Sequence, residues 1–189
     1  MGIFYAAIFI IATACGLNGH AWAAPAKYSG AGWQGTVTHV SDGDTLWVRP
    51  AKIGVKPKPG GQAVNIRIDG IDAPEICQVG GVASRAALIE LVLHKKVHVE
   101  GKRRDAFGRL LARIKIDEFA GVGAPQVDAG SRMVAGGQAW AHEYKRYKSA
   151  YSAEQTQAKA ARRGLFADAR AEHPRDFRKR HGACPHTPK

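Results

Sequence analysis

Acidic residues are scarce in this chain of 189 residues, which has 16 Asp and Glu against 28 Lys and Arg and carries a formal net charge of +12. Such an excess of positive charge favours polyanionic partners, among them nucleic acid, acidic polysaccharide and anionic membrane surfaces. The sequence shows neither an internal repeat nor a second domain, and its length suits one domain with a single core. Charge alone does not choose among these partners, because many small secreted proteins are basic.

Charged side chains are missing altogether from residues 1–23, and the segment from Phe4 to Cys15 is almost entirely apolar. A run of this length is typical of a signal-peptide core and is short for a bilayer span. Small residues at Ala21 and Ala23 indicate cleavage after Ala23. We therefore expect export to the periplasm or the medium, with no membrane span in the mature chain. Lipoprotein processing at Cys15 is the weaker alternative, because the leucine usual in such signals is missing.

Cysteine is also rare, with three in the whole chain. Cleavage after Ala23 would leave only Cys77 and Cys184. Two cysteines in an exported protein often pair, because the compartment is oxidising. We expect a Cys77–Cys184 disulfide, with two unpaired thiols as the alternative.

The apolar pattern predicts a barrel of five strands with about three helices, an α+β fold of the OB type. Strands are expected at 35–41, 45–49, 63–69, 97–101 and 109–116. Helices are expected at 82–93, with Val82, Ala86, Ile89 and Leu93 on the buried face, near 128–136, and from Ser152, which forms a capping box with Gln155, to Gly164. The domain organisation follows as a signal peptide (1–23), a flexible leader (24–32), the barrel domain (33–169) and a basic, irregular tail (170–189).

Three short segments concentrate charge at predicted strand ends and turns: residues 42–45 (DGDT), 67–75 (RIDGIDAPE) and 105–109 (DAFGR). Phosphodiester hydrolysis needs such groups. Carboxylates bind a hard divalent cation, a further carboxylate accepts a proton from water, and guanidinium groups bind phosphate oxygens in a bidentate fork. Each segment alone also has an ordinary structural interpretation, since Asp-Gly is a common hairpin turn. The presence of all three together favours the catalytic interpretation.

These segments, in this order, resemble the signature of the staphylococcal nuclease-like (thermonuclease) family. Weaker similarity extends through residues 133–140 (MVAGGQAW) and 160–166 (AARRGLF), so the resemblance covers roughly residues 33–180. It implies an OB-fold barrel with three helices, one calcium ion, and cleavage that leaves 3′-phosphate ends.

The resemblance also implies roles for individual residues. Asp44, Asp72 and the main-chain oxygen of Ala73 would be calcium ligands, Glu75 the general base, and Arg67 and Arg109 the phosphate-binding arginines that stabilise the transition state. Tyr144 and Tyr147 are ambiguous matches for substrate-stacking tyrosines, because the segment before them carries extra residues. Ala106 stands where well-known members have a lysine that binds a terminal phosphate.

The sequence therefore predicts an exported, calcium-dependent, largely sequence-non-specific endonuclease acting on DNA and RNA. A monomer with no stable protein partner is the default expectation. A non-catalytic nucleic-acid-binding OB-fold module is the main alternative, because this fold also serves for binding alone. A basic cell-envelope binding protein would explain charge and export but would leave the carboxylate cluster without a role.

Overall fold

The structure, a computed structural model, describes residues 32–51, 62–117, 125–143, 148–182 and 184. The expected signal peptide and nearly all of the expected leader lie outside the described residues. The same is true of Tyr144 and Tyr147, so the stacking role expected for these tyrosines stays a prediction.

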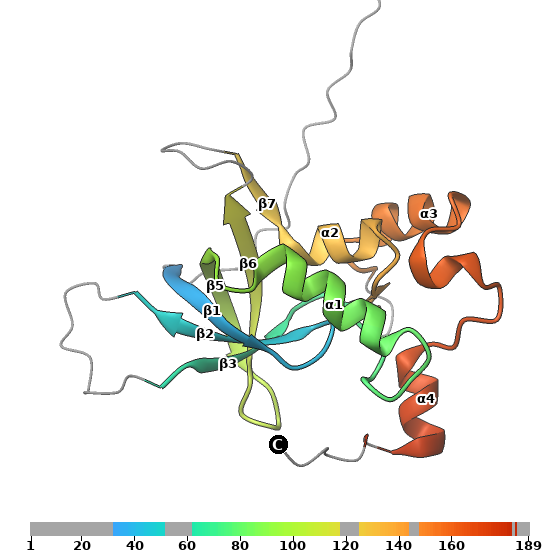
Figure 1. Ribbon diagram of the computed structural model, residues 1–189, viewed down its shortest axis with the longest axis horizontal. Coiled ribbons are helices and arrows are strands. Elements are labelled where there is room, and N and C mark those ends of the chain that lie inside the picture. The colour runs from blue at the N-terminus through green and yellow to red at the C-terminus, as the bar shows by residue number, and fades with distance from the viewer. Residues whose placement is uncertain (1–31, 52–61, 118–124, 144–147, 183, 185–189) are drawn as a thin grey trace, which may run out of the picture.

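A closed five-stranded barrel forms the centre of the fold (Figure 1). Its strands are β1 (Trp33–Val40), β2 (Thr45–Pro50), β3 (Val64–Ile68), β5 (Lys96–Arg104) and β6 (Leu110–Asp117). They pair in the order β3-β2-β1-β5-β6, and a parallel pairing of β3 with β6 closes the barrel. A short strand, β7 (Gln126–Asp128), pairs with the C-terminal part of β6, beyond the residues that pair with β3. The predicted OB-fold barrel is confirmed.

Helices gather on one side of this barrel, as Figure 1 shows. They are α1 (Gly81–Val92), α2 (Ala129–Ala135), α3 (Ser152–Ala160), the 3-10 helix η1 (Gly164–Ala167) and α4 (Pro174–His181). Two very short strands, β4 (Ile71–Asp72) and β8 (Trp140–Ala141), pair with each other outside the main sheet. None of the helices in the described part of the chain has the length and apolar content needed to span a bilayer.

Helix α4 contradicts the expectation of an irregular tail at residues 170–189. Pro174 at the first helical turn needs no backbone N–H partner, and His173 accepts a hydrogen bond from the N–H of Arg175 (3.2 Å). Asp176 in the first turn and four basic residues in the last turn complement the helix dipole. These are ordinary signals for a helix of eight residues. The prediction of an irregular tail gave more weight to the many basic side chains than to these signals.

Helix α1 forms close to its predicted position, but the predicted buried face is wrong. Val82 is 69% exposed, whereas the buried positions are Gly81, Ser84, Leu88 and Val92. Ser84 faces inward because its hydroxyl donates to the carbonyl of Gln138 (2.7 Å) and because Gly43 of the β1–β2 turn packs against it. A pattern that counts only apolar residues misses a serine in this position.

The predicted capping box at the start of α3 does not form. The hydroxyl of Ser152 donates to the carbonyl of Ser149 (2.8 Å), and Gln155 accepts from the N–H of Ala141 (2.9 Å). Gln155 thus connects α3 to β8 instead of capping its own helix. The helix ends at Ala160, and Gly164 begins η1 rather than ending α3.

Gly137 offers a test of the packing between α2 and η1. Its φ is +69°, and a Cβ there would lie 2.0 Å from the carbonyl oxygen of Arg163. Gly108 has a similar φ of +79° but nothing within 4 Å of the Cβ position. Gly108→Ala should cost only about 1–2 kcal/mol, the strain of the left-handed conformation. Gly137→Ala should cost at least about 2 kcal/mol more, because backbone must also move. Free energies of unfolding in urea measure both, and equal losses would contradict the packing described.

Candidate active site

Asp44 lies at the end of the β1–β2 turn and is 3% exposed. Its Oδ1 accepts from the hydroxyl of Thr45 (2.9 Å), and its Oδ2 accepts from the backbone N–H of Ala73 (3.1 Å). The second bond places the backbone of residue 73 against Asp44. Gly43 makes this turn possible, since a Cβ there would lie 1.9 Å from the Ser84 hydroxyl.

Arg67, near the end of β3, connects two carboxylates that are far apart in the sequence. The register pairs Arg67 with Thr45 of β2, so its side chain starts beside Asp44. Its Nη1 lies 2.5 Å from Asp44 Oδ2, and its Nη2 lies 2.8 Å from Asp72 Oδ1. Burial by itself would lower the pKa of Arg67, but Asp44 and Asp72 together raise it. The guanidinium therefore stays charged and holds both aspartates in one place.

Asp72, in β4, is 0% exposed. Burial favours the neutral form of this carboxyl, but hydrogen bonds from Arg178 and the charge of Arg67 outweigh it and lower its pKa. Asp72 is thus an ionised carboxylate in the interior, the costliest state for such a group unless it is well paired.

Asp42, which the sequence suggests only as a turn residue, has an unusual environment. Its Oδ1 accepts from the backbone N–H of Asp44 (3.0 Å). Burial and the neighbouring charge of Asp44 raise the pKa of Asp42 to about 7. Burial and the charge of Asp44 therefore favour the protonated form of Asp42 more than for an exposed aspartate.

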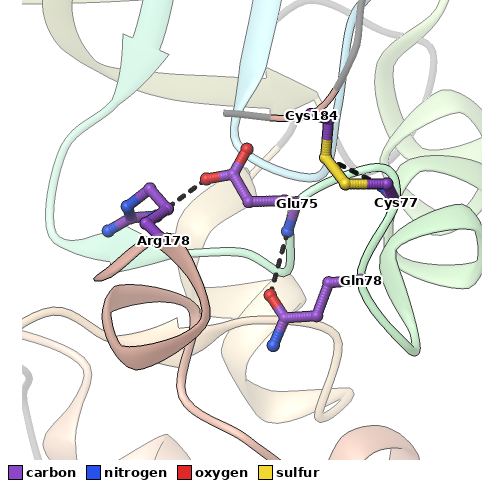
Figure 2. The surroundings of a disulfide bond; sticks show 5 residues. All are labelled: Glu75, Cys77, Gln78, Arg178 and Cys184. Carbon is purple, nitrogen blue, oxygen red and sulfur yellow. Dashed lines mark hydrogen bonds and ion pairs between the residues drawn. A yellow bond between two sulfur atoms is a disulfide. The ribbon is translucent and has the colours of Figure 1, made fainter. Parts of the chain in front are cut away.

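Glu75 follows Pro74 in the loop before α1, and Figure 2 shows its surroundings. Its backbone N–H donates to the side chain of Gln78 (3.2 Å), and its Oε1 lies 2.9 Å from Nη1 of Arg178. Arg178 also contacts both oxygens of Asp72, at 3.1 and 2.9 Å. This one guanidinium therefore places Glu75 beside Asp72.

Cys77 and Cys184 form a disulfide with an S–S distance of 2.01 Å (Figure 2). Cys77 lies two residues after Glu75, and Cys184 lies just beyond α4. The bridge therefore joins the loop that carries Glu75 to the end of the chain that carries Arg178.

Arg109 lies apart from this cluster. Its Nε is 2.8 Å from Asp105 of the same hairpin, and its guanidinium lies 5.3 Å from the ring centre of Phe107. Among the described residues it makes no ion pair with Asp44, Asp72 or Glu75. The β3–β6 register pairs Ile66 with Leu110, which puts Arg109 about two residues back from Arg67 along the neighbouring strand. That spacing, about 7 Å, is within the reach of two arginine side chains.

The structure thus brings together Asp44 of the first charged segment and Arg67, Asp72 and Glu75 of the second, whereas Arg109 of the third segment lies apart from them. Sequence reasoning placed Asp42 in the first charged segment without a role and missed Arg178. Arg178 was expected in a basic, irregular tail, although the pairing of Cys184 with Cys77 requires this part of the chain to lie near Glu75.

The donors present fit a hard divalent cation. Asp44 and Asp72 supply buried carboxylate oxygens, and both carboxylates contact the guanidinium of Arg67. The backbone of Ala73 lies against Asp44. Oxygen donors of this kind suit calcium or magnesium rather than zinc. Groups of three or more His, Cys, Asp or Glu side chains arranged as a metal site do not occur in the described part of the chain. The calcium ligands that the resemblance implies are two carboxylates, Asp44 and Asp72, and one main-chain carbonyl, that of Ala73. This set contains only two such side chains.

Comparison with known proteins finds a matching family and several similar relatives. The family described as "Staphylococcal nuclease homologue" matches residues 65–168. The micrococcal nuclease of Shigella flexneri is 29% identical over 154 residues, covering 79% of this chain and 82% of the relative. An uncharacterized endonuclease of Escherichia coli O157:H7 is 33% identical over 135 residues, covering 71% and 78%.

The match begins inside β3 and ends just after η1, so it includes Arg67, Asp72, Glu75 and Arg109. The barrel, the buried carboxylates and the extent of these similarities lead to one conclusion. The chain belongs to the staphylococcal nuclease homologue family.

Proposed function

We propose that this protein is a calcium-dependent endonuclease that hydrolyses phosphodiester bonds of DNA and RNA with little sequence preference. One observation carries the proposal. Arg67 forms ion pairs with Asp44, which follows β1, and with Asp72 of β4, and Arg178 joins Asp72 to Glu75, with both aspartates almost fully buried. A purely structural barrel has no need for such a costly group of charges.

Asp44, Asp72 and the carbonyl of Ala73 would hold the calcium ion. When bound, the ion supplies positive charge that polarises the phosphate and helps to orient water. The chain prepares this position, because hydrogen bonds from Thr45 and Ala73 orient the Asp44 carboxylate before any ion arrives. The family to which the chain belongs supports metal dependence, and the choice of calcium is part of the proposal.

Arg67 and Arg109 would bind the phosphate oxygens. A guanidinium stays charged at any working pH and offers two parallel N–H groups to a phosphate. Asp44 and Asp72 hold Arg67 in place, whereas Asp105 and Phe107 hold Arg109. Because negative charge on the phosphoryl group increases in the transition state, both contacts would strengthen as the reaction proceeds.

Glu75 would accept the proton of the attacking water. Its side chain is about one quarter exposed, so water can reach it. The Gln78 side chain accepts the N–H of Glu75 and donates to the carbonyl of Glu172 (2.8 Å), which holds the loop in place. We further propose that cleavage leaves 3′-phosphate ends.

The net charge of +12 supports a polyanionic substrate and fast association with it. Export through a signal peptide of residues 1–23, to the periplasm or the medium, belongs to the same proposal, as does a monomeric state.

Incubation with plasmid DNA and with RNA tests the reaction. Both substrates should be degraded in calcium, survive in excess chelator, and be degraded again when calcium is restored. The products should require phosphatase treatment before a polymerase can extend them, because a 3′-phosphate blocks extension. Cutting that persists in chelator would contradict the metal assignment. Binding without cleavage in calcium would instead favour the non-catalytic module.

Glu75→Gln should slow cleavage about 10²- to 10⁴-fold, the usual contribution of a general base, while nucleic-acid binding is retained. Glu90→Gln is the matched control, since Glu90 is exposed on α1 and its substitution removes the same charge. Single-turnover cleavage and filter binding measure the two effects. Near-normal activity of the Glu75 variant would exclude it as the base.

A further inference from the structure

Helix α4 brings an extra cation to the candidate active site from outside the matched part of the chain. The family match ends at residue 168, whereas α4 spans Pro174–His181. Of the basic residues on this helix, Arg178 is the one that contacts both Asp72 and Glu75. The effect of that contact on the site depends on the metal site proposed above.

Arg178 binds the same carboxylates that the proposed function requires to be available. Its Nη1 and Nη2 form a fork on Asp72, at 3.1 Å from Oδ1 and 2.9 Å from Oδ2. Its Nη1 also lies 2.9 Å from Glu75 Oε1 (Figure 2). Bidentate guanidinium–carboxylate contacts are among the stronger hydrogen bonds in proteins.

Asp72 has little acceptor capacity left for a metal ion. An ionised carboxylate offers about four lone-pair sites on its two oxygens. Arg67 uses one site on Oδ1, and Arg178 uses one site on each oxygen. A divalent cation on Asp72 would also face the positive charge of Arg178 at close range, where repulsion in a buried site is strong. The cation and Arg178 therefore compete for Asp72.

The chain keeps Arg178 close to the site by anchoring α4 on both sides. Before the helix, the carbonyl of Glu172 accepts from Gln78, and the ring of His173 lies 5.0 Å from that of Trp140. After the helix, Cys184 is bonded to Cys77. A tethered group returns to its partner at a high effective concentration, so a single guanidinium can compete with a free ion.

We propose that Arg178 is a built-in competitor of the divalent cation, and that α4 is a disulfide-held gate over the site. Without the cation, Arg178 neutralises Asp72 and Glu75 and closes the site. Binding of the cation to Asp72 displaces Arg178 and releases α4, which stays attached through Cys184. The gate thus makes occupancy of the site depend on competition between the cation and Arg178, and loss of the Cys77–Cys184 tether would weaken Arg178 as a competitor.

Calorimetric titration with calcium chloride alone, without nucleic acid, measures this competition. Arg178→Gln should bind calcium about tenfold more tightly than the unchanged protein, because at least one charge-assisted hydrogen bond no longer opposes binding. Arg175→Gln is the matched control, since Arg175 is exposed on the same helix and its loss removes the same charge. Its affinity should stay within about twofold.

Unchanged or weaker calcium binding by Arg178→Gln overturns the proposal. Weaker binding of inorganic phosphate by this variant, with calcium affinity unchanged, would instead make Arg178 a phosphate ligand. If none of the three proteins binds calcium, the proposed metal site fails and the gate fails with it. Calcium binding of equal strength in all three would leave the metal site intact and exclude only the gate.

Two further measurements separate a gate from a merely structural helix. In the unchanged protein, calcium should increase amide hydrogen exchange across residues 174–181, and decreased or unchanged exchange there contradicts displacement. The variant Cys77→Ser with Cys184→Ser should bind calcium more tightly, and adding Arg178→Gln to it should give little further gain. If the disulfide-free protein fails to fold, the exchange experiment still decides the question.

Discussion

The arrangement of the site depends on one interaction, the contact of the Arg67 guanidinium with Asp44 and Asp72. Both aspartates are almost completely buried, and burial of an unpaired carboxylate costs several kcal/mol. Arg67 offsets that cost for two carboxylates at once, at 2.5 and 2.8 Å. The turn after β1, the end of β3 and the short strand β4 therefore have to meet at this point.

The barrel makes that contact possible through its connections. The β2–β3 register places Arg67 opposite Thr45, beside Asp44, and the parallel pairing of β3 with β6 brings the hairpin of Arg109 to the adjacent strand. The loop after β4 then carries Glu75, and the disulfide at Cys77 ties this loop to α4. The turn before β2 and the strands β3 and β4 position the buried charges, while the more exposed Glu75 and Arg178 lie on a loop and on a tethered helix.

Sequence reasoning succeeded where local pattern and tertiary environment agree. Alternation of Val64, Ile66 and Ile68 marked β3 correctly, because one side of that strand faces the core. It failed where a polar side chain makes a distant contact. Ser84 is buried because it bonds to Gln138, and Gln155 leaves its expected cap to bond to Ala141. Neither partner lies close by in the sequence.

The sequence by itself determined the barrel class, the three charged segments and the two cysteines available for pairing, because strand periodicity, residue type and order are local properties. Only the tertiary structure decided that Arg67 joins Asp44 to Asp72, that burial and Asp44 raise the pKa of Asp42, and that Arg178 reaches Asp72 and Glu75. Those outcomes depend on burial and on distances between residues up to 106 positions apart. The order of residues in the chain does not give such distances directly, since they arise only when the barrel closes and the Cys77–Cys184 disulfide holds α4 beside it.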